Sequence, residues 1–237
     1  MSTATPTPAR STGTRPRVTP FSVGAVCAVL GLALLVLVAA RWSPLMAADR
    51  AVATSLHRRA VTEPGFVHVN RILSDWVWDP WTMRVLIAVA VVALWWRGAR
   101  LLAGWVAVTS LLSTLLQQGL KAAIGRERPQ WPDPVDSAHY AAFPSGHAMT
   151  ATVSCGLLLW LLHRHGAGAG PWWTALVVAS VSVIGVGLTR LYLGVHWMSD
   201  VLGGWLLGAA LVGFSIAGFV RHERRGRAVP EHGPHRS

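Results

Sequence analysis

The sequence has little charge and almost no cysteine. Only 13% of its residues are charged whereas 52% are hydrophobic, which argues against an ordinary soluble domain and is typical of membrane proteins. The two cysteines, Cys27 and Cys155, both lie inside apolar runs, so a disulfide framework is not expected. No internal repeat is present, which argues against an architecture of duplicated halves.

Acidic residues are also scarce. The chain has 10 Asp and Glu against 21 Lys and Arg, giving a formal net charge of +11. Such basicity can indicate nucleic-acid binding, but here the basic residues are spread over short loops and tails rather than gathered on one soluble face. We therefore predict no nucleic-acid partner, and we expect the basic C-terminal tail to meet anionic lipid headgroups.

Long apolar runs are abundant. A helix rises about 1.5 Å per residue, so roughly 20 residues cross a hydrocarbon core about 30 Å thick. Four uncharged runs approach or reach this length: Phe21–Ala40, Leu101–Leu120, Pro171–Thr189 and Val201–Val220. Two further runs are too short to span unless they begin earlier. Val85–Trp96 must extend back past Arg84, and Ala148–Leu162 is expected to begin at His147. The sequence thus predicts an all-α membrane bundle of six transmembrane helices over residues 21–220.

The remaining segments are polar or mixed. Residues 1–20 are rich in Thr, Pro and Arg and are predicted to be a disordered cytoplasmic tail; residues 221–237 form a second, basic cytoplasmic tail, also expected to be disordered. A cleaved signal peptide is the rival interpretation of the first apolar run, which is long for that role. Residues 43–80 form the longest connection. They contain a stretch of helical character, 47–60, and fit an interfacial helix or a simple linker equally well.

The distribution of basic residues suggests an orientation. Lys and Arg are almost equally numerous on the two sides of the predicted spans, which is indecisive by the positive-inside rule. However, Lys121, Arg126, Arg128 and Arg190 belong to a candidate site, so function can explain them. Without these four, the side with the termini is clearly more basic, and we expect both termini to be cytoplasmic.

Three short motifs carry the chemistry. They are Lys121 with Arg128-Pro129, the string Pro144-Ser145-Gly146-His147, and Arg190 with His196 and Asp200. Lys121 ends one predicted span and His147 begins the next, while Arg190 ends a span and His196 begins the last. Because successive spans alternate in direction, all three motifs are predicted to lie at one membrane face.

These residue types suit a phosphate ester. Lys121, Arg128 and Arg190 can supply cationic donors, and arginine offers a planar fork for two phosphate oxygens. Ser145 and Gly146 precede a predicted helix, so their backbone N–H groups can face an anion at the positive end of the helix dipole. We predict these five residues as the phosphate-binding set.

Two histidines and one acid can supply the reaction. A neutral His196 can attack phosphorus, and Asp200, one helical turn later, can orient its ring. His147 can protonate the leaving oxygen and then activate water. We expect no metal or other cofactor, since separate roles for two histidines leave no need for one. Taken singly, each residue is more often an interfacial anchor or a turn. Their combination on one face favours a site.

The three motifs resemble those of the type 2 phosphatidic acid phosphatase superfamily, which also includes vanadium-dependent haloperoxidases. The family pattern, Lys-x6-Arg-Pro, Pro-Ser-Gly-His and Ser-Arg-x5-His-x3-Asp, is met except that Thr189 stands where the family usually has Ser. The resemblance implies an all-helical core, a phosphohistidine at His196, proton transfer by His147, and a site facing the extracytoplasmic side.

The expected function is hydrolysis of a lipid phosphate or diphosphate in a membrane. The Ala-, Arg- and Trp-rich composition suggests a bacterial source, so a bacterial plasma membrane is expected. Undecaprenyl diphosphate, phosphatidylglycerophosphate and phosphatidic acid are the substrate types that the resemblance implies. A lipid phosphotransferase would use the same residues, and a non-catalytic phospholipid-binding or transport protein would need only the cations. A haloperoxidase is the least favoured alternative.

Overall fold

The apolar runs fold as long helices. The structure, a computed structural model, describes residues 19–227, and every regular element among them is helical. In chain order the elements are α1 (Pro20–Ala39), α2 (Ser43–Ala60), α3 (Pro64–Ile72), η1 (Leu73–Val77), α4 (Pro80–Trp96), α5 (Arg100–Ile124), α6 (Gly146–Arg164), α7 (Ala169–Tyr192) and α8 (Met198–Arg227). Here η1 is a short π-helix. The predicted all-α class is confirmed.

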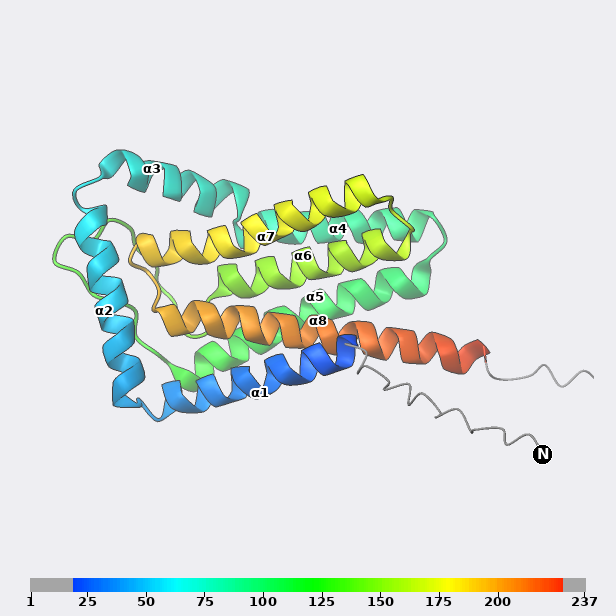
Figure 1. Cartoon of the computed structure of the whole chain (residues 1–237), viewed down its shortest axis with the longest axis horizontal. Helices are drawn as coiled ribbons and strands as arrows, with labels where there is room; N and C mark the ends of the chain where they lie inside the picture. The colour runs from blue at the N-terminus through cyan, green and yellow to red at the C-terminus, as the bar shows by residue number, and fades with distance from the viewer. Residues whose placement is uncertain (1–18, 228–237) are drawn as a thin grey trace, which may run out of the picture.

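Five helical stretches are long and apolar enough to cross a membrane: α1, Pro64–Trp96, α5, α7 and α8. They match five of the six predicted spans, and the predicted start of one of them before Arg84 agrees with α4. The sixth, α6, has 19 residues and a polar first half with two threonines and a serine. By length and hydropathy α6 is therefore not identified as a membrane span. Figure 1 nevertheless shows it running along the bundle beside α7 and α8.

The core of the bundle is built around α6. Leu157 is fully buried among apolar side chains of α4, α5 and α8, which include Ile87, Val106 and Phe219. Small residues let α8 approach its neighbours closely. A Cβ at Gly213 would lie 2.7 Å from the Cα of Gly24 on α1, so a larger residue there would push the two backbones apart.

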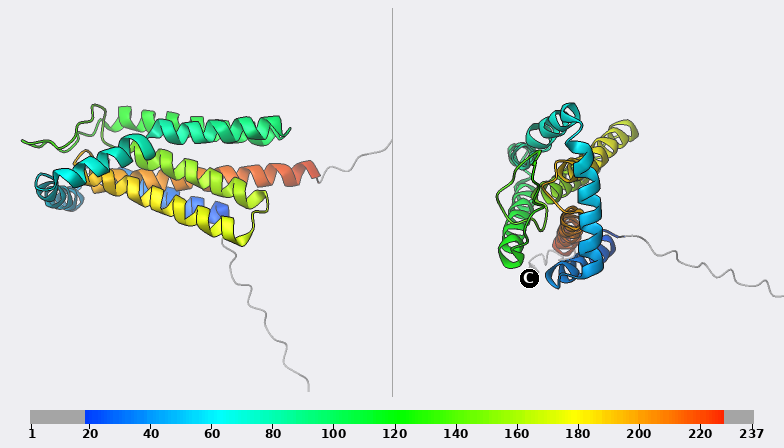
Figure 2. Two further views of the ribbon diagram at one scale, coloured as in Figure 1. Left: turned by 90° about the horizontal axis from the view of Figure 1, so that it is seen from above. Right: turned by 90° about the vertical axis from the view of Figure 1, so that its left-hand side faces the viewer.

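The predicted connection 43–80 is almost wholly helical. α2 lies across one end of the bundle, α3 leads back from that end toward the bundle, and α4 runs along it (Figures 1 and 2). The helical character predicted for residues 47–60 is confirmed, since α2 spans Ser43–Ala60. Its buried residues include Asp49 and His57, so α2 packs on the bundle with polar groups turned inward.

The chain ends lie partly outside the described residues. The prediction of a disordered tail at 1–20 falls mostly on residues 1–18, which are not described; Thr19 caps α1, which begins at Pro20. α8 continues past Val220 to Arg227, so the expected disorder is wrong for residues 221–227. Phe219 packs edge-to-face on Trp105 and Trp160 there, and Arg164 pairs with Glu223, which explains the longer helix. Residues 228–237 are again outside the described part.

Candidate active site

The three motifs meet around one cavity at the end of the bundle where α2 lies. The cavity has a volume of about 340 Å³ and opens beside the start of α4 and the end of α5. Six of the predicted site residues line it: Lys121, Arg128, Gly146, His147, Arg190 and His196. The other two, Ser145 and Asp200, are fully buried behind it. Residues up to 75 positions apart in the sequence thus converge, as the alternating direction of the predicted spans led us to expect.

His196 is held from both sides of its ring. It lies in the loop between α7 and α8, and its Nδ1 is 3.3 Å from Oδ2 of Asp200. Its Nε2 is 3.1 Å from Nη1 of Arg128. A guanidinium group can only donate, so Nε2 must carry a lone pair and Nδ1 the proton. This arrangement directs the unprotonated ring nitrogen toward the cations of the cavity.

The surroundings of His196 keep its imidazole neutral. The side chain is only 2% exposed, and burial lowers its pKa well below the ordinary 6.5, because a charged ring would lose its hydration. The positive charges of Arg128, Arg190 and Lys121 lower the pKa further. A neutral ring retains the lone pair that a nucleophile needs.

Lys121 and Arg128 are both fastened to the loop between α5 and α6. The Lys121 ammonium group donates to the carbonyl of Ala141. Arg128 donates from Nε to the carbonyl of Tyr140 at 2.6 Å and from Nη1 to that of Val195 at 2.6 Å. Burial lowers the pKa of Arg128 to about 10, with Arg190 adding to the effect, so it stays charged at neutral pH. Both cations are therefore oriented by hydrogen bonds to backbone carbonyls of the loops around the cavity.

Arg190 is placed by the segment before α4. Its Nη1 donates to Oγ of Ser74 on η1 at 2.7 Å and lies 3.8 Å from Asp75 Oδ1 and 3.9 Å from Asp136 Oδ2. Its Nε is buried and has no hydrogen-bond partner among the described residues. Arg190 is thus oriented by acids outside the motifs and retains an unused donor beside the cavity.

The structure corrects the prediction for Ser145. Its backbone N–H does not face the cavity, because it donates to the carbonyl of Asp200 at 2.9 Å. The bond ties the start of α6 to the start of α8, and it was missed because it joins residues far apart in the sequence. Gly146 is the first residue of α6 and lines the cavity, so its N–H lies at the positive end of that helix. A Cβ on Gly146 would lie 2.5 Å from Nε2 of Gln117.

His147 also lines the cavity, on the first turn of α6. Among residues 19–227, no group of three or more His, Cys, Asp or Glu side chains has an arrangement that could hold a metal ion. The charged side chains that line the cavity together with the two histidines include Lys121, Arg128 and Arg190.

A buried ion-pair chain behind His196 was not predicted. Arg126 donates from Nη1 to Oδ1 of Asp200 at 2.6 Å and from Nη2 to Oδ2 of Asp49 at 2.7 Å. Asp49 also accepts from the N–H of Ser199 at 2.9 Å and from its hydroxyl at 2.5 Å. We call Asp49, Arg126 and Ser199 the carboxylate clamp. It fixes Oδ1 of Asp200, while Oδ2 accepts from the N–H of Trp197 at 2.8 Å and faces His196.

Part of this clamp left a trace in the sequence. Arg126 stands two residues before Arg128, in the motif region, and was counted there as a site charge without a role. Asp49 lies in the connection 43–80, and no spacing relates it to the motifs. Only the packing of α2 across the bundle end brings it to Arg126.

More than half of the chain matches a known protein family. The family model of the PAP2 superfamily matches residues 102–224, slightly more than half of the chain. The chain belongs to the PAP2 superfamily. The matched range contains all three motifs and helices α6, α7 and nearly all of α5 and α8, so the family resemblance predicted from the motifs is confirmed.

Two relatives of this chain have names that state an activity. The chain is 36% identical over 114 residues to phosphatidylglycerophosphatase B of Bacillus subtilis (strain 168), an alignment covering 48% of this chain and 55% of that protein. It is 26% identical over 159 residues to an undecaprenyl-diphosphatase of Sulfolobus acidocaldarius, covering 63% of this chain and 67% of the relative. The chain thus spans little more than half the length of the Bacillus protein.

A solved structure has the same fold. The crystal structure of a transmembrane PAP2 type phosphatidylglycerolphosphate phosphatase from Bacillus subtilis matches 84% of this chain and 96% of its own, with a TM-score of 0.73 and 24% sequence identity. The likeness extends beyond the matched family range to the helices before α5. It supports an integral membrane protein with this helical architecture.

Proposed function

We propose that this chain is a membrane phosphatase that hydrolyses a lipid phosphate or lipid diphosphate through a phosphohistidine at His196. The observation that carries the proposal is a neutral, buried histidine directed at a cavity with Lys121, Arg128 and Arg190. A binding protein would need the cations alone. It would not need an imidazole held between an acid and an arginine.

In the first step a phosphorus–nitrogen bond forms, a phosphorus–oxygen bond breaks and one proton is transferred. A phosphoryl oxygen set is bound by Lys121, Arg128 and Arg190, with the N–H of Gly146 at the helix end. Nε2 of His196 attacks phosphorus, and the bond from phosphorus to the lipid oxygen breaks. His147 donates a proton to that oxygen, so the lipid leaves as an alcohol, or as a monophosphate when the substrate is a diphosphate.

The second step reverses the proton flow. Water attacks phosphorus, the phosphorus–nitrogen bond breaks, and His147 accepts the proton that the water loses. Inorganic phosphate leaves, and Nε2 recovers its lone pair. Asp200 stabilises the positive ring of the phosphohistidine through Nδ1–H, and the carboxylate clamp holds Asp200 in the required position.

We propose that the reaction needs no metal ion. A metal would serve to neutralise the phosphate and to activate a nucleophile. Three cationic side chains meet the first need and the lone pair of His196 meets the second.

The substrate proposal rests on the relatives. Phosphatidylglycerophosphate and undecaprenyl diphosphate follow from the names of the two similar proteins, and phosphatidic acid from the family. All three carry a terminal phosphate on a membrane tail. A cavity at the end of a helical bundle suits them, because the headgroup can reach it while the tail stays in the bilayer.

We further propose six transmembrane spans, with α6 as the fourth, in a bacterial plasma membrane. α6 is supported as a span by its position among the five apolar ones and by its buried surface. The described ends of the chain, at α1 and α8, lie away from the α2 end (Figure 1). With cytoplasmic termini, the cavity would face the extracytoplasmic side.

Phosphate release by purified protein tests the proposal. Wild-type protein with EDTA should release inorganic phosphate from at least one of the three lipids, whereas His196→Ala should lose at least 1,000-fold in turnover, or about 4 kcal/mol of transition-state stabilisation. Near-normal turnover by the variant would refute the nucleophile, and loss of wild-type activity in EDTA would refute the metal-free mechanism. Labelled phosphate recovered on another lipid would identify a phosphotransferase instead.

A further inference from the structure

A second cavity lies beside the carboxylate clamp, on a different side from the candidate active site. Its volume is about 590 Å³, and it is walled by the end of α1, the start of α2 and the end of α5. None of its lining residues is shared with the cavity of His196. Arg126 and Asp49 of the clamp form part of its wall.

The cavity carries positive charge that the protein does not neutralise. Arg41 and Arg50 both line it and are both exposed. Within residues 19–227, neither has a carboxylate oxygen within 4 Å. Asp49 cannot serve them well, because Arg126 and Ser199 already occupy both of its oxygens. The remaining acid of the lining is Glu127, whose single negative charge cannot balance both Arg41 and Arg50.

The start of α2 adds donors to this surface. Ser43 is the first residue of the helix and lines the cavity, and no side chain caps the helix, since Trp42 precedes it. The first N–H groups of a helix lie at the positive end of its dipole. In α2, Pro44 has no N–H and Met46 donates to the carbonyl of Trp42, so the donors that remain beside the cavity are the N–H and hydroxyl groups of Ser43. Together with Arg41 and Arg50 they form a site suited to one phosphate group.

The position of the cavity matches that of a lipid headgroup. Arg41 comes two residues after the end of α1, an apolar span of mean hydropathy 2.7, so it lies where the hydrocarbon region ends. α2 then lies across the bundle end (Figure 1). Val38 and Ile124 line the cavity on the membrane side, and exposed apolar residues such as Val36 and Leu116 continue down α1 and α5. Acyl chains can therefore lie against these helices below the cavity.

We propose that this cavity binds the phosphodiester headgroup of an anionic membrane phospholipid as a second lipid site. The ligand would bind without reacting, because the lining contains no histidine or cysteine to attack phosphorus. It would also lie next to Arg126, whose other side holds Asp200. The inference does not rest on the proposed hydrolysis, since it concerns binding alone.

Lipid binding to an inactive protein tests this inference. Protein carrying His196→Ala is purified in a neutral detergent and titrated with phosphatidylglycerol, a phosphodiester, while native mass spectrometry counts retained lipid. A saturable single lipid is expected, with phosphatidylcholine retained at least tenfold more weakly. Adding Arg41→Gln and Arg50→Gln together should weaken phosphatidylglycerol binding at least tenfold.

Matched variants separate the possible causes. Arg58→Gln with Arg59→Gln removes the same charge from exposed positions of the same helix and should leave binding unchanged. Arg50→Lys keeps the charge and should retain most of the binding, which covers the case in which the double glutamine variant does not fold. Wild-type binding by the double variant, equal retention of phosphatidylcholine, or full displacement by millimolar inorganic phosphate would each overturn the proposal, the last by indicating a site for free phosphate.

Discussion

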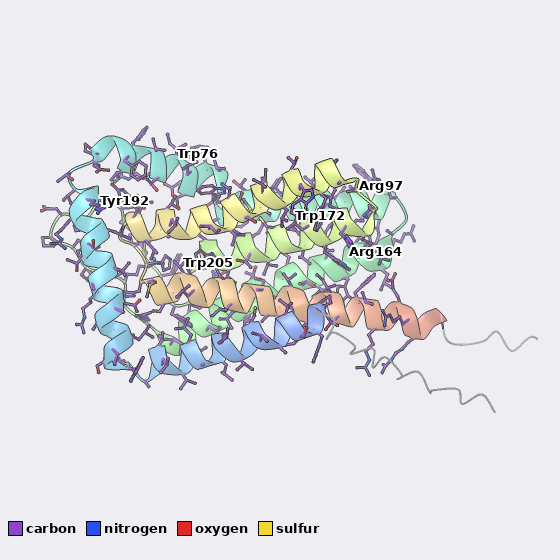
Figure 3. The ribbon with its side chains drawn as sticks, viewed as in Figure 1. Trp76, Arg97, Arg164, Trp172, Tyr192 and Trp205 are labelled. Atoms are coloured by element: carbon purple, nitrogen blue, oxygen red, sulfur yellow. The ribbon has the colours of Figure 1, made fainter. Side chains whose placement is uncertain are left out.

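Both ends of the bundle carry charged side chains, but these are buried at one end and partly exposed at the other. At the end covered by α2, Lys121, Arg190, His196 and Asp200 are each at most 8% exposed and are held by specific partners. At the other end, where Figure 3 labels Arg164, this side chain pairs with Glu223. The two side chains are 32% and 26% exposed. Burying charge is costly unless it is paired, whereas an exposed pair gains little. Among residues 19–227, buried charged side chains lie at the α2 end only, which is the end that we propose as the active one. The predictions below test that contrast.

The largest effect is expected from Arg126→Gln. It leaves Asp49 and Asp200 as buried carboxylates without their shared counter-ion, and breaking a buried pair in this way typically costs about 3–5 kcal/mol. A thermal melt in detergent should show a large fall in the unfolding midpoint, together with loss of phosphate release. A melt close to that of the wild type would mean that the clamp is not a buried charge network.

A smaller effect, seen in kinetics, is expected from Asp49→Asn. The amide keeps the size of the side chain and can still accept from Ser199, but it weakens the hold on Arg126 and thereby the position of Asp200. We expect kcat to fall about tenfold, or about 1.4 kcal/mol, with KM nearly unchanged and a shifted pH profile. Asp49→Glu should recover part of kcat, and Arg58→Gln on the same helix is the control. An equal rise in KM would instead indicate a general loss of structure.

The buried end should also make stability depend on pH. Burial lowers the pKa of His196 in the folded protein, so below its ordinary value of 6.5 the unfolded chain binds a proton that the folded one does not. Stability from this residue is therefore lost as pH falls below about 6.5, by up to about 1.4 kcal/mol per pH unit. Unfolding followed between pH 7 and pH 5 should show a shallower decline for His196→Gln. Equal slopes would contradict a depressed pKa.

The smallest effect is expected at the opposite end. Arg164→Gln removes a partly exposed ion pair with Glu223, and pairs of this kind contribute about 0.2–1 kcal/mol. The unfolding midpoint should move slightly, less so in high salt, and phosphate release should not change. A loss comparable to that of Arg126→Gln would remove the contrast between the two ends.

The site was largely predictable from the sequence, and its supports were not. Lys121, Arg128, His147 and His196 could be placed together because apolar runs alternate in direction and each motif lies at the end of a run. Spacing also placed Asp200 one turn after His196. The direction of the Ser145 N–H was predicted wrongly, because its acceptor is a carbonyl on another helix and local pattern contains no record of it.

The connection between the first two spans shows the same limit. Its helical character could be predicted from 47–60, but its role could not. In the structure it supplies Asp49 to Arg126 and Ser74 to Arg190, so two cations of the site are oriented from outside the motifs. These contacts depend on α2 and η1 packing against the bundle end, which no periodicity within the segment specifies.

The sequence by itself determined the helical membrane class, most of the spans and the side chains that we propose as reactive. Those properties depend on local apolar length and on residue types at short spacing. Only the tertiary structure decided how His196 and Asp200 are held, that Arg126 is their buried counter-ion, and that a second cationic cavity lies behind them. Each of these depends on contacts between distant segments, whose geometry follows from how the helices pack.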